Sequence, residues 1–309
     1  MNAFEKYGKL RVEGTSLLSK DGEKVQLKGP STLGLVWYPD FINKEAFETI
    51  HSWGASLIRL AMYTQEEDGY LTPEGDQEFT KGLIDKGVRY ASELGMYVII
   101  DWHILSDGNP KASQDEAVRF FDEMSLKYKD NDNVIYEICN EPNGDDVTWS
   151  VVKSYAETVI PVIRKNSPDS IILVGTPKWS QLVDDAADDP IKGYQNIMYS
   201  LHYYAASHKE ELRNKLRYAL SKELPVFIDE YSICDASGNG GLDYDEAKKW
   251  AKIADENMIS YAQWSISPRD ESAAMVKASC KKLSGWTDDD LTETGLWMKD
   301  RLSGKISYL

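Results

Sequence analysis

The chain has 309 residues, of which 51 are acidic and 35 basic, and its formal net charge of −16 makes nucleic acid and anionic membranes poor partners. Hydrophobic residues make up 42% of the sequence and charged residues 28%, as in ordinary globular proteins. No apolar run approaches the roughly 20 residues of a membrane-spanning helix, so no such segment is predicted. Residues 1–6 do not begin a signal peptide, so we expect either an intracellular protein or a domain cut from a larger precursor.

The first predicted element is a β-hairpin over residues 10–27, with Asp21 and Gly22 as its turn. Apolar runs of strand type follow, and they predict eight strands at 25–28, 56–60, 96–101, 134–138, 171–174, 197–201, 226–228 and 262–266. Amphipathic stretches between them predict helices at 43–53, 76–94, 113–128, 147–165, 208–221, 244–257 and 292–302. Asn43 is the expected cap of the first helix, and residues 184–189 predict a short helix without a metal site.

Eight nearly continuous apolar strands, each followed by a helix, predict a parallel sheet that is covered by helices. Eight such repeats close as a (β/α)8 TIM barrel of about 250 residues. We therefore expect an α/β protein with a single domain over residues 1–309, in which the hairpin and the loops take up the surplus length. In such barrels the functional residues gather at the C-terminal ends of the strands.

Two of the predicted strands carry a glutamate at their C-terminal end. The run at 134–138 leads into Asn140, Glu141 and Pro142, and the run at 226–228 leads into Asp229 and Glu230. Two carboxyl groups that face each other across a cleft are the minimal equipment for hydrolysing a glycosidic bond. Glu141 and Glu230 are therefore the candidate catalytic pair.

Other strand ends carry residues that suit a site. Arg59 lies inside an apolar strand, where its charge needs a partner, either a carboxylate at the barrel mouth or a purely structural ion pair. His103 and His202 each end a strand, and two of only four histidines at such positions favour a site over a structural role. Trp37 and Trp264 are candidates for stacking on a sugar ring, with packing at the barrel rim as the alternative.

Histidines beside carboxylates raise the alternative of a metal centre. The zinc-binding spacing His-Glu-x-x-His is absent, so no metal is expected, and no phosphate-binding glycine loop predicts a nucleotide cofactor. The other two histidines, His51 and His208, fall in predicted helices and are expected at the surface. The three cysteines lack metal-ligand spacing and form no even set, so reduced thiols are expected.

Four long stretches carry a family resemblance, at residues 97–105, 134–144, 176–181 and 269–274. On these the chain resembles glycoside hydrolase family 5, and within it the bacterial endo-β-1,4-glucanases of the second subfamily. The resemblance runs from about Leu17 to Leu302. It implies a cellulase that hydrolyses internal β-1,4-glucosidic bonds of cellulose and related β-glucans, by double displacement with retention of anomeric configuration.

Carried over residue by residue, the resemblance implies that Glu141 is the general acid/base and Glu230 the nucleophile. Arg59 and Tyr204 would keep Glu230 charged, and His202 would lie close to Glu141. The remaining residues that the resemblance implies are Asn140 at the sugar 2-hydroxyl, His103 and Trp264 at the cleaved sugar, Trp37, Arg269 and Glu271 on the glycone side, and Trp179 on the aglycone side. Tyr63 is expected to bind substrate as well.

Three positions depart from the pattern of close relatives. Leu33 stands where they usually carry histidine, so a glycone-side polar contact is expected to be missing. Tyr231 replaces a tryptophan after the nucleophile, and Asp229 replaces a serine or threonine before it. An additional carboxylate beside Glu230 is expected to shift the working pH.

The resemblance also implies a β-glucan polysaccharide as the partner, no cofactor, and a monomer that acts outside the cell, alone or as one module of a larger protein. Three alternatives remain open. The first is another β-glycan, such as mannan, xyloglucan or mixed-linkage glucan. The second is a barrel that binds glycans without catalysis, and the third is a metal-dependent barrel enzyme such as an aldolase or amidohydrolase.

Overall fold

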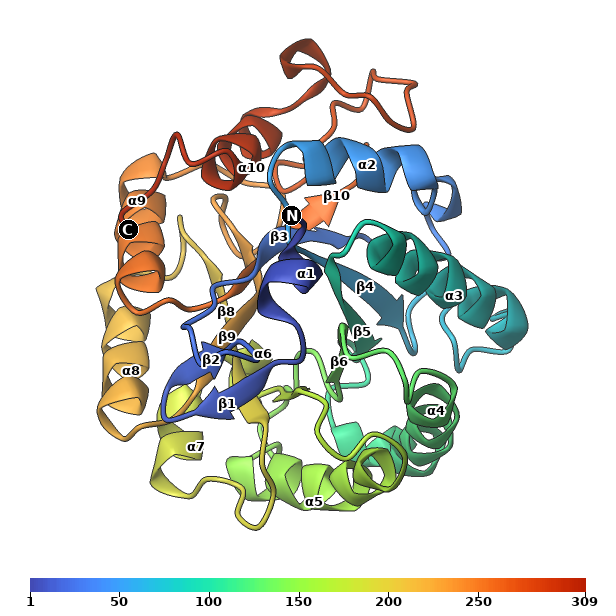
Figure 1. The fold of residues 1–309 in the computed structure, drawn as a ribbon, viewed down its shortest axis with the longest axis vertical. Helices are drawn as coiled ribbons and strands as arrows, with labels where there is room; N and C mark the ends of the chain where they lie inside the picture. The colour runs from blue at the N-terminus through green and yellow to red at the C-terminus, as the bar shows by residue number, and fades with distance from the viewer.

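In the computed structural model, which describes residues 1–309, eight parallel strands close into a barrel that is ringed by helices (Figure 1). The strands follow one another around the barrel in chain order, and β10 pairs with β3 to close it. They are β3 (Lys28–Thr32), β4 (Leu57–Tyr63), β5 (Tyr97–His103), β6 (Val134–Glu137), β7 (Ile172–Val174), β8 (Ile197–Tyr204), β9 (Val226–Ser232) and β10 (Tyr261–Ile266). The predicted (β/α)8 barrel is confirmed.

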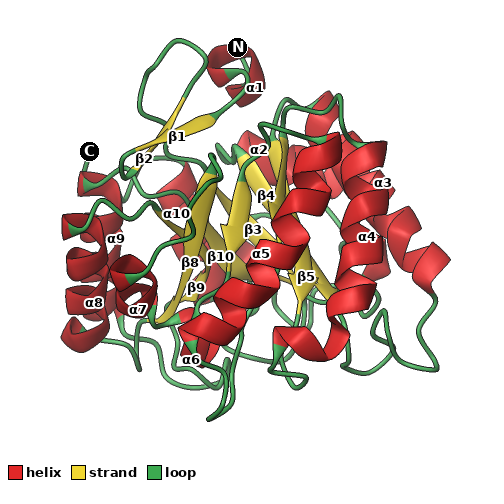
Figure 2. Ribbon diagram, turned by 90° about the horizontal axis from the view of Figure 1, so that it is seen from below, coloured by secondary structure: helices red, strands yellow, loops and turns green.

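Helices cover the outside of the barrel (Figures 1 and 2). The long ones are α2 (Lys44–Ser52), α3 (Gln77–Glu93), α4 (Gln114–Lys127), α5 (Trp149–Asn166), α8 (Glu210–Ser221), α9 (Tyr244–Glu256) and α10 (Glu293–Leu302). The short ones are α1 (Ala3–Tyr7), α6 (Pro177–Ser180), α7 (Val183–Asp188) and the 3-10 turns η1 (Pro39–Phe41), η2 (Pro110–Ser113) and η3 (Asp288–Asp290). Asn43 caps α2 as predicted, since its side chain accepts a hydrogen bond from the Ala46 amide at 2.7 Å. None of the helices has the length and apolar character that crossing a bilayer requires.

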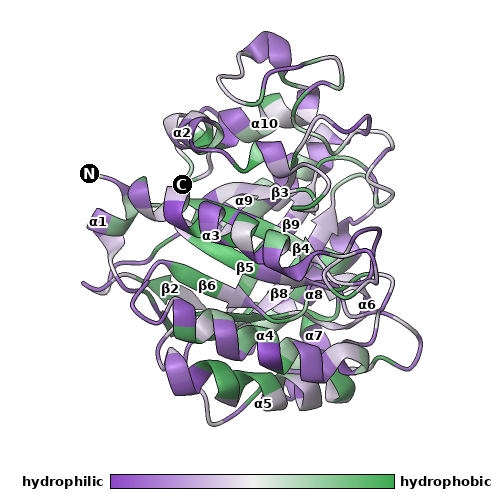
Figure 3. Cartoon of the chain, turned by 90° about the vertical axis from the view of Figure 1, so that its right-hand side faces the viewer, coloured by the Kyte–Doolittle hydropathy of each residue, from purple (hydrophilic) through white to green (hydrophobic).

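The main core lies between the strands and the helices. A cluster of 72 buried hydrophobic residues joins the outer faces of the strands to the inner faces of the helices. Figure 3 shows the same division, with β5 and β6 largely hydrophobic and the surrounding helices alternating between hydrophobic and hydrophilic residues. No disulfide contributes, because Cys139, Cys234 and Cys280 are all free thiols.

A second, smaller core of 13 residues fills the N-terminal half of the barrel interior. Inward-facing side chains such as Leu57, Tyr97 and Phe227 meet Leu17 and Leu27 from the N-terminal segment, and all five are almost completely buried. This apolar plug closes the end of the barrel at which the strands begin. Charged side chains inside the barrel are therefore confined to its C-terminal half, where the candidate site is expected.

The N-terminal segment differs in detail from the prediction. The structure has two successive hairpin turns here: β1 (Arg11–Glu13) and β2 (Ser16–Leu18) pair around a turn at residues 14–15 that was not predicted. The predicted turn at Asp21 and Gly22 is also present, since Leu18 pairs with Lys24 across it. The first barrel strand begins at Lys28, three residues later than predicted. The reason is tertiary, because Val25 pairs with Leu17 of the hairpin, and Val25 and Leu27 place their side chains in the plug inside the barrel.

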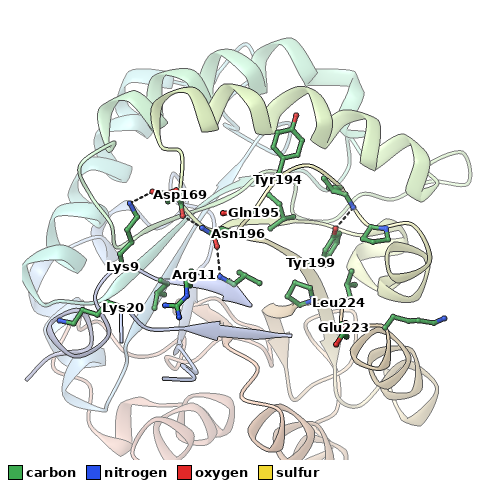
Figure 4. Close-up of a pocket in the computed structure, with 17 residues that line it drawn as sticks. Lys9, Arg11, Lys20, Asp169, Tyr194, Gln195, Asn196, Tyr199, Glu223 and Leu224 are labelled. Atoms are coloured by element: carbon green, nitrogen blue, oxygen red, sulfur yellow. Dashed lines mark hydrogen bonds and ion pairs between the residues drawn. The ribbon is translucent and has the colours of Figure 1, made fainter. Parts of the chain in front are cut away.

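A hollow of about 750 Å³ lies between this hairpin and the N-terminal ends of the last strands (Figure 4). Charged and polar side chains that line this hollow are already paired with neighbouring residues. Lys9 Nζ lies 3.2 Å from Asp132 and 3.1 Å from Asp169, and the Asn196 side chain accepts a hydrogen bond from the Val12 amide at 2.9 Å. These contacts fasten the hairpin to the barrel, at the end away from Glu141 and Glu230.

Candidate active site

A cleft of about 670 Å³ opens at the C-terminal ends of the strands. It brings together most of the residues that the sequence analysis proposed. Those that line it are Trp37, Tyr63, His103, Glu141, Trp179, His202, Tyr204, Glu230, Trp264, Arg269 and Glu271. Arg59 and Asn140 do not line the cleft; both are fully buried and lie directly behind its lining residues.

The two glutamates face each other in this cleft. Glu141 lies in the loop that follows β6, and Glu230 lies within β9 and pairs in register with His202 of β8. One carboxylate oxygen of each glutamate lies within 4.8 Å of the other. A carboxyl separation of about 5–5.5 Å suits a retaining glycosidase, whereas about 6.5–9.5 Å suits an inverting one.

Arg59 is the centre of a buried ionic network beneath the cleft. Its guanidinium forms a bidentate pair with Glu137, with both N–O distances 2.7 Å, and contacts Asp101 and Glu230 at 3.0 Å each. It also donates a hydrogen bond to Asn140 Oδ1 at 2.6 Å. The carboxylate partner that the sequence analysis required is therefore not one group but three.

One guanidinium cannot balance three buried carboxylates, so two of them are more easily protonated. Burial raises the pKa of Asp101 to about 8 and raises the pKa of Glu137 well above its usual value, despite the nearby charge of Arg59. Burial would also raise the pKa of Glu230, but the charges of His202 and Arg59 lower it below the usual value. Tyr204 adds a hydrogen bond from its hydroxyl to Glu230 Oε1 at 2.8 Å. Glu230 is therefore the carboxyl that carries the negative charge.

Glu141 has the opposite electrostatic surroundings. Burial and the negative charge of Glu230 raise its pKa, although a contact of 2.9 Å between His202 Nδ1 and Glu141 Oε1 acts against that rise. Two carboxyls whose pKa values are pushed apart are suited to different chemical tasks. Glu141 is suited to giving up a proton and Glu230 to attacking as an anion.

His103 and Asn140 support the network from the side of β5. Burial and the charge of Arg59 lower the pKa of His103 well below its usual value, so its ring is neutral. Its Nδ1 lies 2.5 Å from Asp101 and its Nε2 lies 3.1 Å from the Asn140 amide nitrogen, which fits a ring that carries its proton on Nδ1. The Asn140 side chain also donates to the carbonyl of Ile104 at 3.0 Å, so it braces the loop that carries Glu141.

Aromatic side chains form the walls of the cleft. Tyr63 lies beside Trp37 and His103, with ring centroids 4.4 and 4.1 Å apart, and Trp264 stacks on His103 at 5.3 Å. Across the cleft, Trp179 leaves 44% of its surface exposed. An exposed aromatic face suits stacking on a sugar ring. Trp37 and Trp264 also line the cleft, but Trp264 is only 6% exposed.

One end of the cleft carries a charged pair. Arg269 Nε lies 3.1 Å from Glu271, and the guanidinium lies 5.9 Å from the centre of the Trp37 ring. Leu33 also lines the cleft, and its apolar side chain offers no hydrogen bond there.

Some site residues were missed by the sequence analysis. Asp101 and Glu137 lie within apolar strands, so the argument that required a partner for Arg59 could have found them. His208 was placed wrongly on the surface of a helix. It precedes α8, is half-buried, lines the cleft and accepts a hydrogen bond from the Tyr204 amide at 2.8 Å.

Two sets of side chains come close enough to hold a metal ion. They are Glu137, His202 and Asp229, and Glu141, His202 and Glu230, with ligand atoms within 4.8 Å in each set. A metal ligand must be a neutral imidazole, however, and hydrogen bonding to Asp229 and Glu141 raises the pKa of His202 well above its usual value against the effect of burial.

The model of the family described as cellulase (glycosyl hydrolase family 5) matches residues 18–270. Endoglucanase A of Butyrivibrio fibrisolvens is 49% identical over 300 residues, which are 96% of this chain and 69% of that protein. An endoglucanase of Clostridium saccharobutylicum is 45% identical over 96% of this chain and 65% of its own length. This chain belongs to glycosyl hydrolase family 5.

Solved structures of family 5 have the same fold. The catalytic domain of Thermobifida fusca endoglucanase Cel5A superposes with a TM-score of 0.92 at 37% identity, over 98% of this chain and 99% of that one. A variant of that domain has been solved in complex with cellotetraose. The chain spans about two thirds of the length of the two curated family 5 relatives, 69% and 65%.

Proposed function

We propose that this protein is a retaining endo-β-1,4-glucanase that hydrolyses internal bonds of cellulose and related β-glucans. The observation that carries the proposal is the pair Glu141 and Glu230, whose carboxylate oxygens lie within 4.8 Å and whose pKa values are shifted in opposite directions. Family 5 membership and the names of the relatives, which are endoglucanases, support the same reaction.

In the first step, Glu230 attacks the anomeric carbon while Glu141 donates its proton to the departing glycosidic oxygen. The sugar is then bound to Glu230 as an ester, and the other half of the polymer leaves as an alcohol. In the second step, Glu141 takes a proton from water, which attacks the same carbon and releases Glu230. Two inversions give net retention of configuration.

The change of role of Glu141 follows from the charge of Glu230. While Glu230 is an anion, it raises the pKa of Glu141 and keeps the proton there. Glycosylation removes that negative charge, so Glu141 ionises more readily and becomes the base that the second step needs. No metal or cofactor takes part in either step of this proposal.

The walls of the cleft support a polymeric, uncharged substrate. Trp37 and Trp179 both line the cleft and are candidates for sugar stacking on either side of the two glutamates. The Thermobifida fusca domain that shares this fold has been solved with cellotetraose. We propose a monomer that acts outside the cell, alone or as one module of a longer protein, as the relatives' greater lengths suggest.

The first test is the release of reducing sugar from carboxymethyl cellulose, barley β-glucan and mannan by the wild type and by Glu230→Gln. Activity on the glucans should fall by about four orders of magnitude or more in the variant, because no anion remains to attack. Glu256→Gln, on the exposed face of α9, serves as the control and should retain full activity. Activity on mannan alone would keep the mechanism and replace the substrate.

The second test separates the two glutamates and the stereochemistry. Glu141→Gln should glycosylate Glu230 at a near-normal rate with a dinitrophenyl cellobioside, whose leaving group needs no proton, but should lose activity on β-glucan. Proton NMR of the earliest products of the wild type should show the β-anomer. An initial α-anomer would contradict the double displacement.

A further inference from the structure

Asp229 has no place in the reaction scheme, yet its carboxylate is fully buried next to the catalytic pair. One of its oxygens, Oδ2, accepts a hydrogen bond from the hydroxyl of Ser200. The other, Oδ1, lies 3.2 Å from His202 Nε2. Neither Oδ1 nor Nε2 has a hydrogen bond to any group, so the ion-pair contact between them is the one polar interaction recorded for these two buried atoms.

The backbone explains how two consecutive acidic residues reach the barrel interior. Between β8 and β9 the register shifts, so that Ser200 pairs with Phe227 but His202 pairs with Glu230. The strand β9 thus holds one extra residue relative to β8, and such a bulge turns neighbouring side chains toward the same side. Asp229 and Glu230 consequently both contact side chains inside the barrel.

The other ring nitrogen of His202 faces the second carboxylate. Nδ1 lies 2.9 Å from Glu141 Oε1, so the ring stands between Asp229 and Glu141. A neutral imidazole that donates from Nε2 to Asp229 has a lone pair on Nδ1, so the proton of Glu141 would have to lie on Oε1 and point at the ring rather than at the substrate. A ring that carries protons on both nitrogens donates to both carboxyl groups and leaves the Glu141 proton on Oε2, where it is free to reach the glycosidic oxygen.

We propose that Asp229 is a positioning residue that holds His202 as an imidazolium against Glu141. The inference rests on the proposed role of Glu141 as acid/base. Where a serine or threonine precedes the nucleophile, no carboxylate is available for this contact. The His202 cation would orient the carboxyl of Glu141 and limit how strongly that carboxyl retains its proton in this protein.

Other charged and titratable groups also surround His202, and the carboxylates among them favour its protonation. Burial tends to lower the pKa of His202, whereas Asp229, Glu141 and Glu230 raise it. The groups that face or surround it are Glu137 and Glu141 from β6 and its loop, Asp229 and Glu230 from β9, Arg59 from β4, Asp101 and His103 from β5, and Tyr204 and His208 from β8 and the segment after it. Asp229 and Glu141 are the two that contact its nitrogens directly.

The test is the protonation state of His202 in protein labelled with nitrogen-15 at its four histidines. In the wild type, NMR should show both ring nitrogens of His202 protonated from pH 5 to pH 8. In Asp229→Asn, which keeps the shape and removes the charge, the midpoint for loss of one proton should fall by about 1–3 pH units. His202→Gln assigns the signals.

Two further variants keep this test decisive. Asp229→Ser removes the carboxylate with a smaller side chain and should show the same shift if Asp229→Asn does not fold. Asp255→Asn removes another fully buried aspartate, which pairs with Arg301 outside the cleft, and should leave the His202 signals unchanged. An unaltered His202 titration in both Asp229 variants would overturn the proposal.

The activity readout is the alkaline limb of kcat/KM on barley β-glucan. In Asp229→Asn both the Asp229 anion and the His202 cation are lost. His202 is nearer to Glu141, so the loss of its charge dominates and raises the pKa of Glu141. The alkaline limb should therefore move to higher pH. An unchanged limb would overturn the link to Glu141. A wild type that shows the His202 signature but hydrolyses no β-glycan would instead contradict the proposed function.

Discussion

At the scale of single residues, the site depends on giving two similar carboxyls opposite proton affinities. Arg59 and Tyr204 contact Glu230 and stabilise its anion. The charge of Glu230 raises the pKa of Glu141, and the contact with His202 offsets that rise only in part. The same guanidinium leaves Asp101 and Glu137 with raised pKa values. Of the three carboxyls around Arg59, Glu230 is therefore the one that most readily stays ionised, as the proposed nucleophile requires.

Removal of one hydrogen bond should be visible in the pH profile. Tyr204→Phe deletes the donor to Glu230 Oε1, and a hydrogen bond to a charged group contributes about 1.5 kcal/mol, which corresponds to about one pKa unit. The pKa of Glu230 rises, so the acidic limb of kcat/KM on barley β-glucan should move up by about one pH unit. Tyr203→Phe, whose ring stacks on Trp250 outside the barrel, is the control and should not move that limb.

At the scale of elements, the turn α6 carries Trp179 in an unusual backbone conformation. Lys178, Trp179 and Ser180 all have positive φ angles, 59°, 57° and 55°, and none of them is glycine. The buried Ser180 hydroxyl donates to the carbonyl of Asn140 at 2.6 Å, and the Trp179 amide donates to the carbonyl of Pro142 at 3.1 Å. The turn thus connects the exposed indole with the loop of Glu141, at a cost in backbone strain.

This strain predicts that a glycine will stabilise the fold here. A left-handed residue other than glycine costs about 1–2 kcal/mol, and glycine recovers most of that, less its larger entropy in the unfolded chain. Lys178→Gly should raise the free energy of unfolding by about 0.5–1 kcal/mol, measured by urea denaturation. Lys248→Gly, at an exposed position inside α9, should lower it by about 1 kcal/mol. A decrease at both positions would show that α6 is not strained.

At the scale of the whole molecule, the net charge of −16 acts on charged substrates but not on neutral ones. Carboxymethyl cellulose is an anion and is repelled at low ionic strength. Raising salt from about 10 mM to about 150 mM shortens the screening length from about 30 Å to about 8 Å, so kcat/KM on that substrate should rise by about twofold or more. Barley β-glucan, which is neutral, should show no such increase in the same assay. An equal rise on both substrates would show that salt acts on the protein itself and not on its electrostatic repulsion of the substrate.

Local patterns in the sequence were sufficient for the architecture and for the catalytic pair. Apolar runs of strand length, each followed by an amphipathic stretch, predict a parallel sheet covered by helices, and eight such repeats predict its closure into a barrel. Glu141 and Glu230 stand directly after such runs, so their convergence follows from the barrel itself. The roles of Trp179, Arg269 and Glu271 came from the family resemblance and not from the pattern.

Only the tertiary structure decided which groups touch. Val25 and Leu27 fit the pattern of a strand, yet they fill the barrel interior, because that space must be closed by apolar side chains from somewhere in the chain. His208 reaches the cleft because the chain turns before α8, which helical periodicity does not record. The contact between Asp229 and His202 depends on a one-residue register shift between β8 and β9. Sequence periodicity determines which face of a strand or helix a side chain lies on. Strand register and the path of the loops determine which charged groups that side chain contacts.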